Sequence, residues 1–169
     1  SVKNVCVNPN TLVVLLDMDD ALIHQDVLSR IALEVDKGAD VVLGGMFRPD
    51  KPLRRYCHRW KKNRTLDAGN VWTHLRSYKK HLFESLSLDD LQRDGDWIPW
   101  CTDFATMIPI VERAKFPVSI PEYLYYHERT TANTKGIRKE KDEVIRWIIS
   151  KPGYETKDPV SAEHQEDRN

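Results

Sequence analysis

Apolar and polar residues in the first part of the chain follow two different periods. Residues 13–16 are four consecutive apolar residues, two of them β-branched, which is typical of a buried parallel strand. In residues 25–37 the apolar positions recur at spacings of one, three and four, so an amphipathic helix that ends at Gly38 is expected. Residues 39–45 form a second apolar run that ends in two glycines. This order predicts a strand, helix, strand unit with a right-handed crossover.

The rest of the chain predicts more helices and a pair of strands. The expected elements are a helix-prone segment at 71–86, a helix at 104–114 capped by Thr102, a strand pair at 118–121 and 123–127, and a last amphipathic helix at 140–150. Together with the first unit, they predict an α/β fold with a mixed, mostly parallel sheet flanked by helices.

Composition and charge exclude several classes of protein. The chain has 169 residues and 40% hydrophobic content, enough for one domain. Lys+Arg and Asp+Glu both number 26, and this neutral balance argues against a nucleic-acid coat or a membrane-surface protein. No apolar run approaches the ~20 residues that span a bilayer, and no signal-peptide pattern is present. Cys6, Cys57 and Cys101 are scattered, which disfavours disulfides or zinc, so a cytoplasmic location is expected.

Three carboxylates follow the first apolar run directly. Asp17, Asp19 and Asp20 come where a strand would deliver them to the carboxyl edge of the sheet. Because like charges at this spacing repel one another, the cluster predicts a divalent cation, Mg²⁺ or Mn²⁺, among them. The alternative is an Asp-rich turn that caps the following helix.

A loop at residues 94–100 carries two tryptophans, Trp97 and Trp100, together with Asp96. Glycine and proline interrupt this segment, so it cannot be a regular helix. An exposed indole is costly unless it meets a flat, partly apolar partner, and a sugar ring is such a partner. The alternative is that both indoles cover the core.

Several motifs in order resemble those of one enzyme family. They are DxDD at 17–20, VVLGG at 41–45, HLRSYKKHLF at 74–83, DGDW at 94–97, TDFATMIPIVERA at 102–114 and YLYYHERTTANT at 123–134. This order resembles glycosyltransferase family 2, whose members are nucleotide-sugar-dependent inverting enzymes with the Rossmann-like GT-A fold. The resemblance covers about residues 13–133 and implies a nucleotide-sugar donor and a glycan or other hydroxyl acceptor.

The resemblance also implies roles for individual residues. Asp17 would lie nearest the donor ribose, Asp19 would bind the metal with help from Asp20, and Arg129 would contact phosphate. His127 would lie near the metal or the diphosphate.

On the acceptor side, the resemblance implies a catalytic base and a binding surface. Asp103 matches the aspartate that removes the acceptor proton. The acceptor-binding residues would be Asp96, Trp97, Trp100, His74 and Arg76.

The chain departs from the family at its start. Family members carry a nucleotide-binding half before the acidic motif, whereas only twelve residues precede Val13. Residues 1–150 are therefore expected to be the C-terminal portion of a GT-A domain, followed by a polar tail at 151–169. The uncovered strand at the sheet edge is expected to recruit a second copy, giving a homodimer or a strand-swapped form.

Two alternative functions remain open. The segment LLDMDDALI at 15–23 resembles the first motif of haloacid-dehalogenase-type phosphatases, with Asp17 as nucleophile and Asp19 as acid/base. That family has Gly-Thr where this chain has Asp20-Ala21. The other alternative is a non-catalytic glycosyltransferase remnant that acts as an interaction domain.

Overall fold

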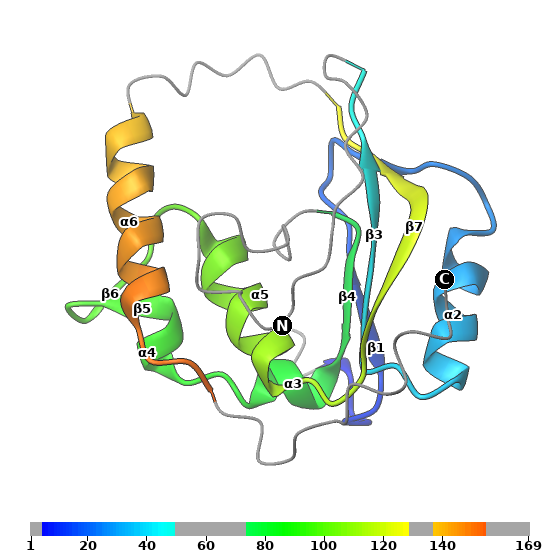
Figure 1. Cartoon of the computed structure of the whole chain (residues 1–169), viewed down its shortest axis with the longest axis horizontal. Helices are drawn as coiled ribbons and strands as arrows, with labels where there is room; N and C mark the ends of the chain where they lie inside the picture. The colour runs from blue at the N-terminus through cyan, green and yellow to red at the C-terminus, as the bar shows by residue number, and fades with distance from the viewer. Residues whose placement is uncertain (1–4, 50–73, 129–136, 155–169) are drawn as a thin grey trace.

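The computed structural model describes residues 5–49, 74–128 and 137–154. A mixed five-stranded sheet lies at its centre, in the order β1-β4-β3-β7-β2 (Figure 1). Strands β1 (Leu12–Leu15), β3 (Val41–Phe47) and β7 (Pro117–Tyr126) run in one direction, and β4 (Arg76–Lys79) and β2 (Ala21–Leu22) run in the other. The predicted α/β fold, with a mixed sheet flanked by helices, is confirmed.

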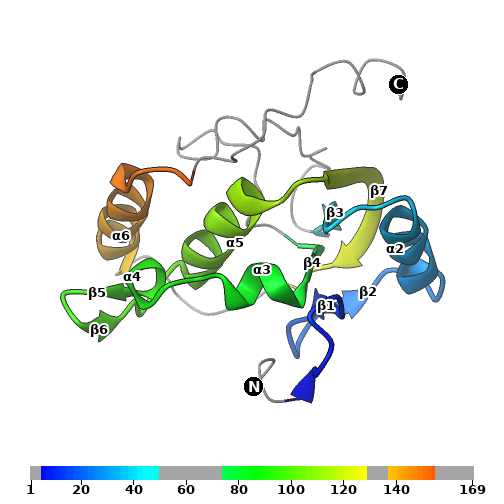
Figure 2. The ribbon, with the colours of Figure 1, turned by 90° about the horizontal axis from the view of Figure 1, so that it is seen from below.

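Helices cover both faces of the sheet (Figures 1 and 2). Helix α2 (Val27–Asp36) lies on one face, where Val27 and Ile31 are buried in one hydrophobic core. The other face carries α3 (Lys80–Glu84), α4 (Leu88–Leu91), α5 (Thr102–Arg113) and α6 (Arg138–Ser150) around a second core. A hairpin of β5 (Gln92–Arg93) and β6 (Asp96–Trp97) extends beside α4 and α6.

Because β3 and β7 run parallel, β7 ends at the same end of the sheet as β1. The buried Asp40 carboxylate accepts hydrogen bonds from the backbone N–H groups of Lys115 at 2.7 Å and Phe116 at 3.0 Å. These bonds connect the segments that precede β3 and β7. Further along, a Cβ at Gly45 would lie 2.8 Å from the Glu122 carbonyl oxygen. Only glycine allows this close approach, and the register of the pair shifts at that point.

Two expectations about the strands are wrong in detail. The strand before the acidic cluster is not a buried parallel strand, because β1 is a half-buried edge strand that pairs antiparallel with β4. Residues 76–79, expected to be helical, form β4 between β1 and β3. Pairing on both sides and burial outweigh local helix propensity here.

The helix boundaries were predicted more closely. Helices α2 and α6 lie where amphipathic spacing placed them, and Gly38 ends α2 with φ of +104°. Helix α5 begins at Thr102 itself, so the cap position belongs to Cys101 and not to Thr102. The expected strand pair around Pro121 is one continuous strand, β7.

The last described residues contact the helical layer. Within 151–154, Tyr154 packs on the helical layer, and its hydroxyl donates to Asp90 at 2.6 Å.

Among the described helices, none has the length and apolar character needed to cross a membrane. Cys6 and Cys101 are free thiols, and Cys57 lies outside the described residues.

The position of β1 at the sheet edge leads to a prediction about assembly. An apolar edge strand with unpaired backbone groups recruits a partner strand, so we expect a homodimer or a strand-swapped form. Light scattering across a concentration series would measure the association. Leu16→Lys, at the exposed residue directly after this strand, should shift the equilibrium toward monomer without disturbing the core. A wild-type chain that stays monomeric at high concentration would contradict the prediction.

Candidate active site

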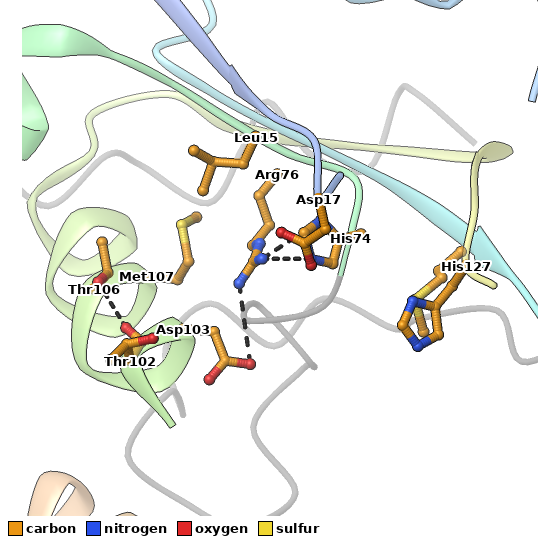
Figure 3. Close-up of a pocket in the computed structure, with 10 residues that line it drawn as sticks. Leu15, Asp17, His74, Arg76, Thr102, Asp103, Thr106, Met107 and His127 are labelled. Carbon is orange, nitrogen blue, oxygen red and sulfur yellow. Dashed lines mark hydrogen bonds and ion pairs between the residues drawn. The ribbon is translucent and has the colours of Figure 1, made fainter. Parts of the chain in front are cut away.

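A cavity of about 460 Å³ opens where the end of β1, the start of β4, the end of β7 and the start of α5 meet (Figure 3). Five residues singled out in the sequence line it: Asp17, His74, Arg76, Asp103 and His127. They come from distant parts of the chain. In Figure 3, Asp103 and His127 lie on opposite sides of Asp17 and His74.

Asp17 lies two residues after the end of β1, and its position is fixed from two sides. Its backbone N–H donates to the Tyr125 hydroxyl at 3.1 Å, and its carboxylate Oδ2 lies 3.0 Å from His74 Nε2. The carboxylate remains 54% exposed, so it is available to a ligand in the cavity.

His74 supports Asp17 as a neutral side chain. Burial, with the adjacent Arg76 guanidinium, lowers the pKa of His74 to about 4. At neutral pH the imidazole is therefore uncharged, and its contact with Asp17 is not an ion pair. The same Nε2 atom also contacts Nη2 of the Arg76 guanidinium. The imidazole also stacks on the Tyr125 ring, with the ring centroids 4.3 Å apart.

Asp103 lies in the first turn of α5, where the helix dipole and the backbone N–H groups favour a negative charge. Its carboxylate Oδ2 is 4.0 Å from Arg76 Nη1, and the side chain is 38% exposed. Burial raises the pKa of Asp103, and Arg76 offsets part of this effect. The residue is thus a partly buried carboxylate with raised proton affinity that faces the cavity, as a general base requires.

Asp20, predicted to help bind the metal, is held by hydrogen bonds within the chain. Its side chain is completely buried, and it accepts hydrogen bonds from the Tyr125 hydroxyl at 2.7 Å and from the Glu128 N–H at 2.8 Å. Its Oδ2 also lies 2.9 Å from His127 Nδ1. Although burial raises the pKa of Asp20, hydrogen bonds from His127, Tyr125 and Glu128 bring it below its usual value. With both oxygens engaged, Asp20 holds His127.

His127 follows the last residue of β7, and its ring is oriented by Asp20. Its backbone N–H donates to the Phe47 carbonyl at 2.9 Å. Because Asp20 accepts a hydrogen bond from Nδ1, the neutral ring carries its lone pair on Nε2. The arrangement is the carboxylate–histidine pair that typically orients an imidazole toward a metal ion or an anion.

The predicted cation stays a prediction. Asp17 and His127 present a carboxylate oxygen and an imidazole nitrogen to one cavity, and both suit Mn²⁺ or Mg²⁺. Asp19 lies in the exposed turn after β1 and is not among the cavity-lining residues. Within 5–49, 74–128 and 137–154, no group of three His, Cys, Asp or Glu is arranged to hold a metal. The donors therefore fit a cation shared with a ligand such as a diphosphate. Arg129, the predicted phosphate contact, lies outside the described residues.

The predicted acceptor residues divide into two groups. His74 and Arg76 line the main cavity, although from β4 and its approach and not from a helix. Asp96 and Trp97 line a different cavity, which shares no residue with the main one. Trp100 is half-buried, and Lys141 Nζ lies 5.3 Å from its ring centroid. Their role in acceptor binding stays a prediction.

Tyr125 is the functional residue that sequence reasoning missed. It is completely buried, stacks on His74, and bonds both Asp17 and Asp20. The sequence contains no local signal for this role, because the partners lie 108 and 105 residues away.

Comparisons with known proteins place the fold. A scan against protein-family models finds no match to the sequence, and neither does a search of curated proteins. Among solved structures, the chain is similar to TarS 1–349 of S. aureus, with a TM-score of 0.52 at 15% identity over 81% of this chain and 40% of that one.

Two further TarS structures contain bound molecules. The complex with UDP gives a TM-score of 0.53 at 14% identity, over 82% of this chain and 39% of TarS. The complex with UDP-GlcNAc gives a TM-score of 0.52 at 15% identity, over 81% of this chain and 41% of TarS. TarS is a glycosyltransferase, so the chain has a glycosyltransferase fold. It spans about two fifths of the TarS chains.

Proposed function

We propose that this chain belongs to a glycosyltransferase of family 2 that transfers a sugar from a nucleotide-sugar donor to an acceptor hydroxyl with inversion. The observation that carries the proposal is the convergence of Asp17, Asp103 and His127 on one cavity of a glycosyltransferase fold. In this proposal residues 1–150 are the C-terminal portion of a GT-A domain. The binding of UDP and UDP-GlcNAc by TarS supports a nucleotide sugar as donor.

The donor would lie at the Asp17 and His127 end of the cavity. Asp17, held by His74 and by the Tyr125 hydroxyl, accepts hydrogen bonds from the ribose hydroxyls. His127, through Nε2, and Asp19, from the turn after β1, would hold a divalent cation near the diphosphate. When bound, the cation offsets the negative charge on the diphosphate leaving group.

The acceptor would lie at the Asp103 end. The carboxylate removes the proton from the acceptor hydroxyl as this oxygen attacks the anomeric carbon on the face opposite the diphosphate. Attack from the opposite face inverts the configuration at that carbon. Arg76, 4.0 Å from Asp103, lowers the pKa of this carboxyl group and so favours its ionised form against the effect of burial.

Calorimetry tests the donor half of this proposal. We expect Mn²⁺ alone to bind weakly, because the described residues supply too few ligands, and to bind more tightly in the presence of uridine or guanosine diphosphate. His127→Ala should remove the gain. Asp94→Asn, whose exposed carboxylate lies outside the main cavity, should retain it.

The opposite results are equally specific. Equal, undetectable binding in every titration would contradict the proposal and favour a non-catalytic interaction domain. Hydrolysis of an aryl phosphate in the presence of Mg²⁺, lost in Asp17→Asn, would instead support the phosphatase alternative.

A further inference from the structure

The second cavity, of about 230 Å³, lies at the β5–β6 hairpin. It is lined by Arg93, Asp94, Asp96, Trp97, Ile98 and Pro99 of the hairpin segment, and by Val144 of α6. Its polar groups are two carboxylates and one guanidinium, set beside an indole and aliphatic side chains.

The hairpin holds this surface on a defined frame. Asp94 and Gly95 form the turn with φ of +54° and +88°. Ile98 is buried in the core, and its backbone N–H donates to the Leu91 carbonyl at 3.1 Å. The Arg93 guanidinium lies 5.8 Å from the centroid of the Trp147 ring and 3.7 Å from the Asp94 carboxylate. The hairpin is thus anchored to the molecule on both sides of its turn.

The indole of Trp97 is nevertheless 64% exposed. An exposed indole on an anchored frame offers a flat apolar surface to a ligand. A pyranose ring has one apolar C–H face and an edge of hydroxyl groups. The indole matches that face, and the Asp96 carboxylate and the Arg93 guanidinium match the hydroxyl edge.

The chain itself links this cavity to the active site. Pro99 lines the hairpin cavity, and Thr102 lines the main one. Three residue steps span at most about 11 Å, so the Cα atoms of Pro99 and Thr102, which border the two cavities, lie within this distance of each other. A monosaccharide bound against Asp103 would leave the hairpin cavity open, whereas a longer glycan can occupy both.

We propose that the acceptor is an oligosaccharide or a longer glycan, with its reacting hydroxyl at Asp103 and a more distant sugar unit stacked on Trp97. This inference rests on the proposed function and names its acceptor class. Asp96 and Trp97 do not line the main cavity, and the inference gives them a role in the second one.

Capture on immobilised linear glycans, from monosaccharides to hexasaccharides, tests the inference directly. Wild type should retain oligosaccharides and not monosaccharides, and Trp97→Ala should lose about tenfold or more of this binding, as expected for a central aromatic contact. Asp96→Asn should weaken it less. Phe116→Ala, which removes an exposed aromatic outside both cavities, should bind as wild type does.

The nucleotide titration separates the two proposals. Trp97→Ala should keep its gain in Mn²⁺ binding with a nucleoside diphosphate, because the hairpin does not line the donor end. If nucleotide binds but no glycan is captured, or if Trp97→Ala captures glycans as well as wild type, the hairpin inference is wrong and the proposed function stands. If Trp97-dependent glycan capture occurs without nucleotide binding, the proposed function fails.

Discussion

Asp103→Asn is expected to abolish sugar transfer while leaving donor binding nearly intact. The amide keeps the size of the side chain and most of its contacts at the start of α5, but it cannot accept the acceptor proton. Loss of a general base lowers turnover by roughly 10²–10⁴-fold. Initial rates and donor affinity, measured in any form of the protein that transfers sugar, would check this. A variant with near-normal turnover, or one that loses donor affinity instead, would show that the residue or its role is misassigned.

The pH dependence gives an independent test of the same base. Turnover should rise with pH through the pKa of Asp103, which burial raises, because the base must be deprotonated. Arg76 lowers this pKa, so Arg76→Gln should move the rising limb to higher pH. Arg76→Lys keeps a positive charge and should return the limb toward that of wild type. An unchanged profile in Arg76→Gln would exclude Asp103 as the titrating group.

Asp20→Asn is expected to lower the affinity for Mn²⁺ with a nucleoside diphosphate by roughly 10–100-fold, the usual cost of losing the partner of a ligating histidine. The amide replaces one acceptor oxygen with a donor, so this side chain can no longer accept from the Tyr125 hydroxyl, His127 Nδ1 and the Glu128 N–H at the same time. Calorimetry would measure the loss. Tyr125→Phe keeps the ring stacked on His74 and should cost less.

A readout on the imidazole separates orientation from general stability. Nitrogen NMR shifts of His127 should report protonated Nδ1 in wild type and a mixture of tautomers in Asp20→Asn. If Asp20 only stabilised the fold, the melting temperature would fall while the tautomer of the folded protein stayed unchanged. That outcome would show that Asp20 does not orient His127.

Local sequence signals predicted where three cavity-lining residues lie in the fold. Asp17 follows an apolar run, Asp103 lies at a helix start, and His127 follows a strand. Each signal involves only a few neighbouring residues, and a glycosyltransferase-like order of motifs suffices to group them. Their convergence on one cavity follows from the parallel course of β1, β3 and β7.

The features that the sequence did not predict depend on contacts between residues that are far apart in the chain. Residues 76–79 have the cations and aromatics of a surface helix, and only pairing with β1 and β3 makes them a strand. Asp20 has the same local context as Asp19, yet the partners Tyr125 and His127, 105 and 107 residues away, turn it inward. Neither outcome is encoded in a short window of sequence.

The most direct test of the account is paramagnetic broadening of amide NMR signals by Mn²⁺ in the presence of a nucleoside diphosphate. Signals from residues 17–20, His74 and His127 should broaden first, and only when the diphosphate is present. Signals at the hairpin around Asp94 and Asp96 should persist. Broadening centred on the hairpin or spread over all exposed carboxylates, with signals at residues 17–20 and His127 unaffected, would contradict the placement of the donor site and with it the proposed function.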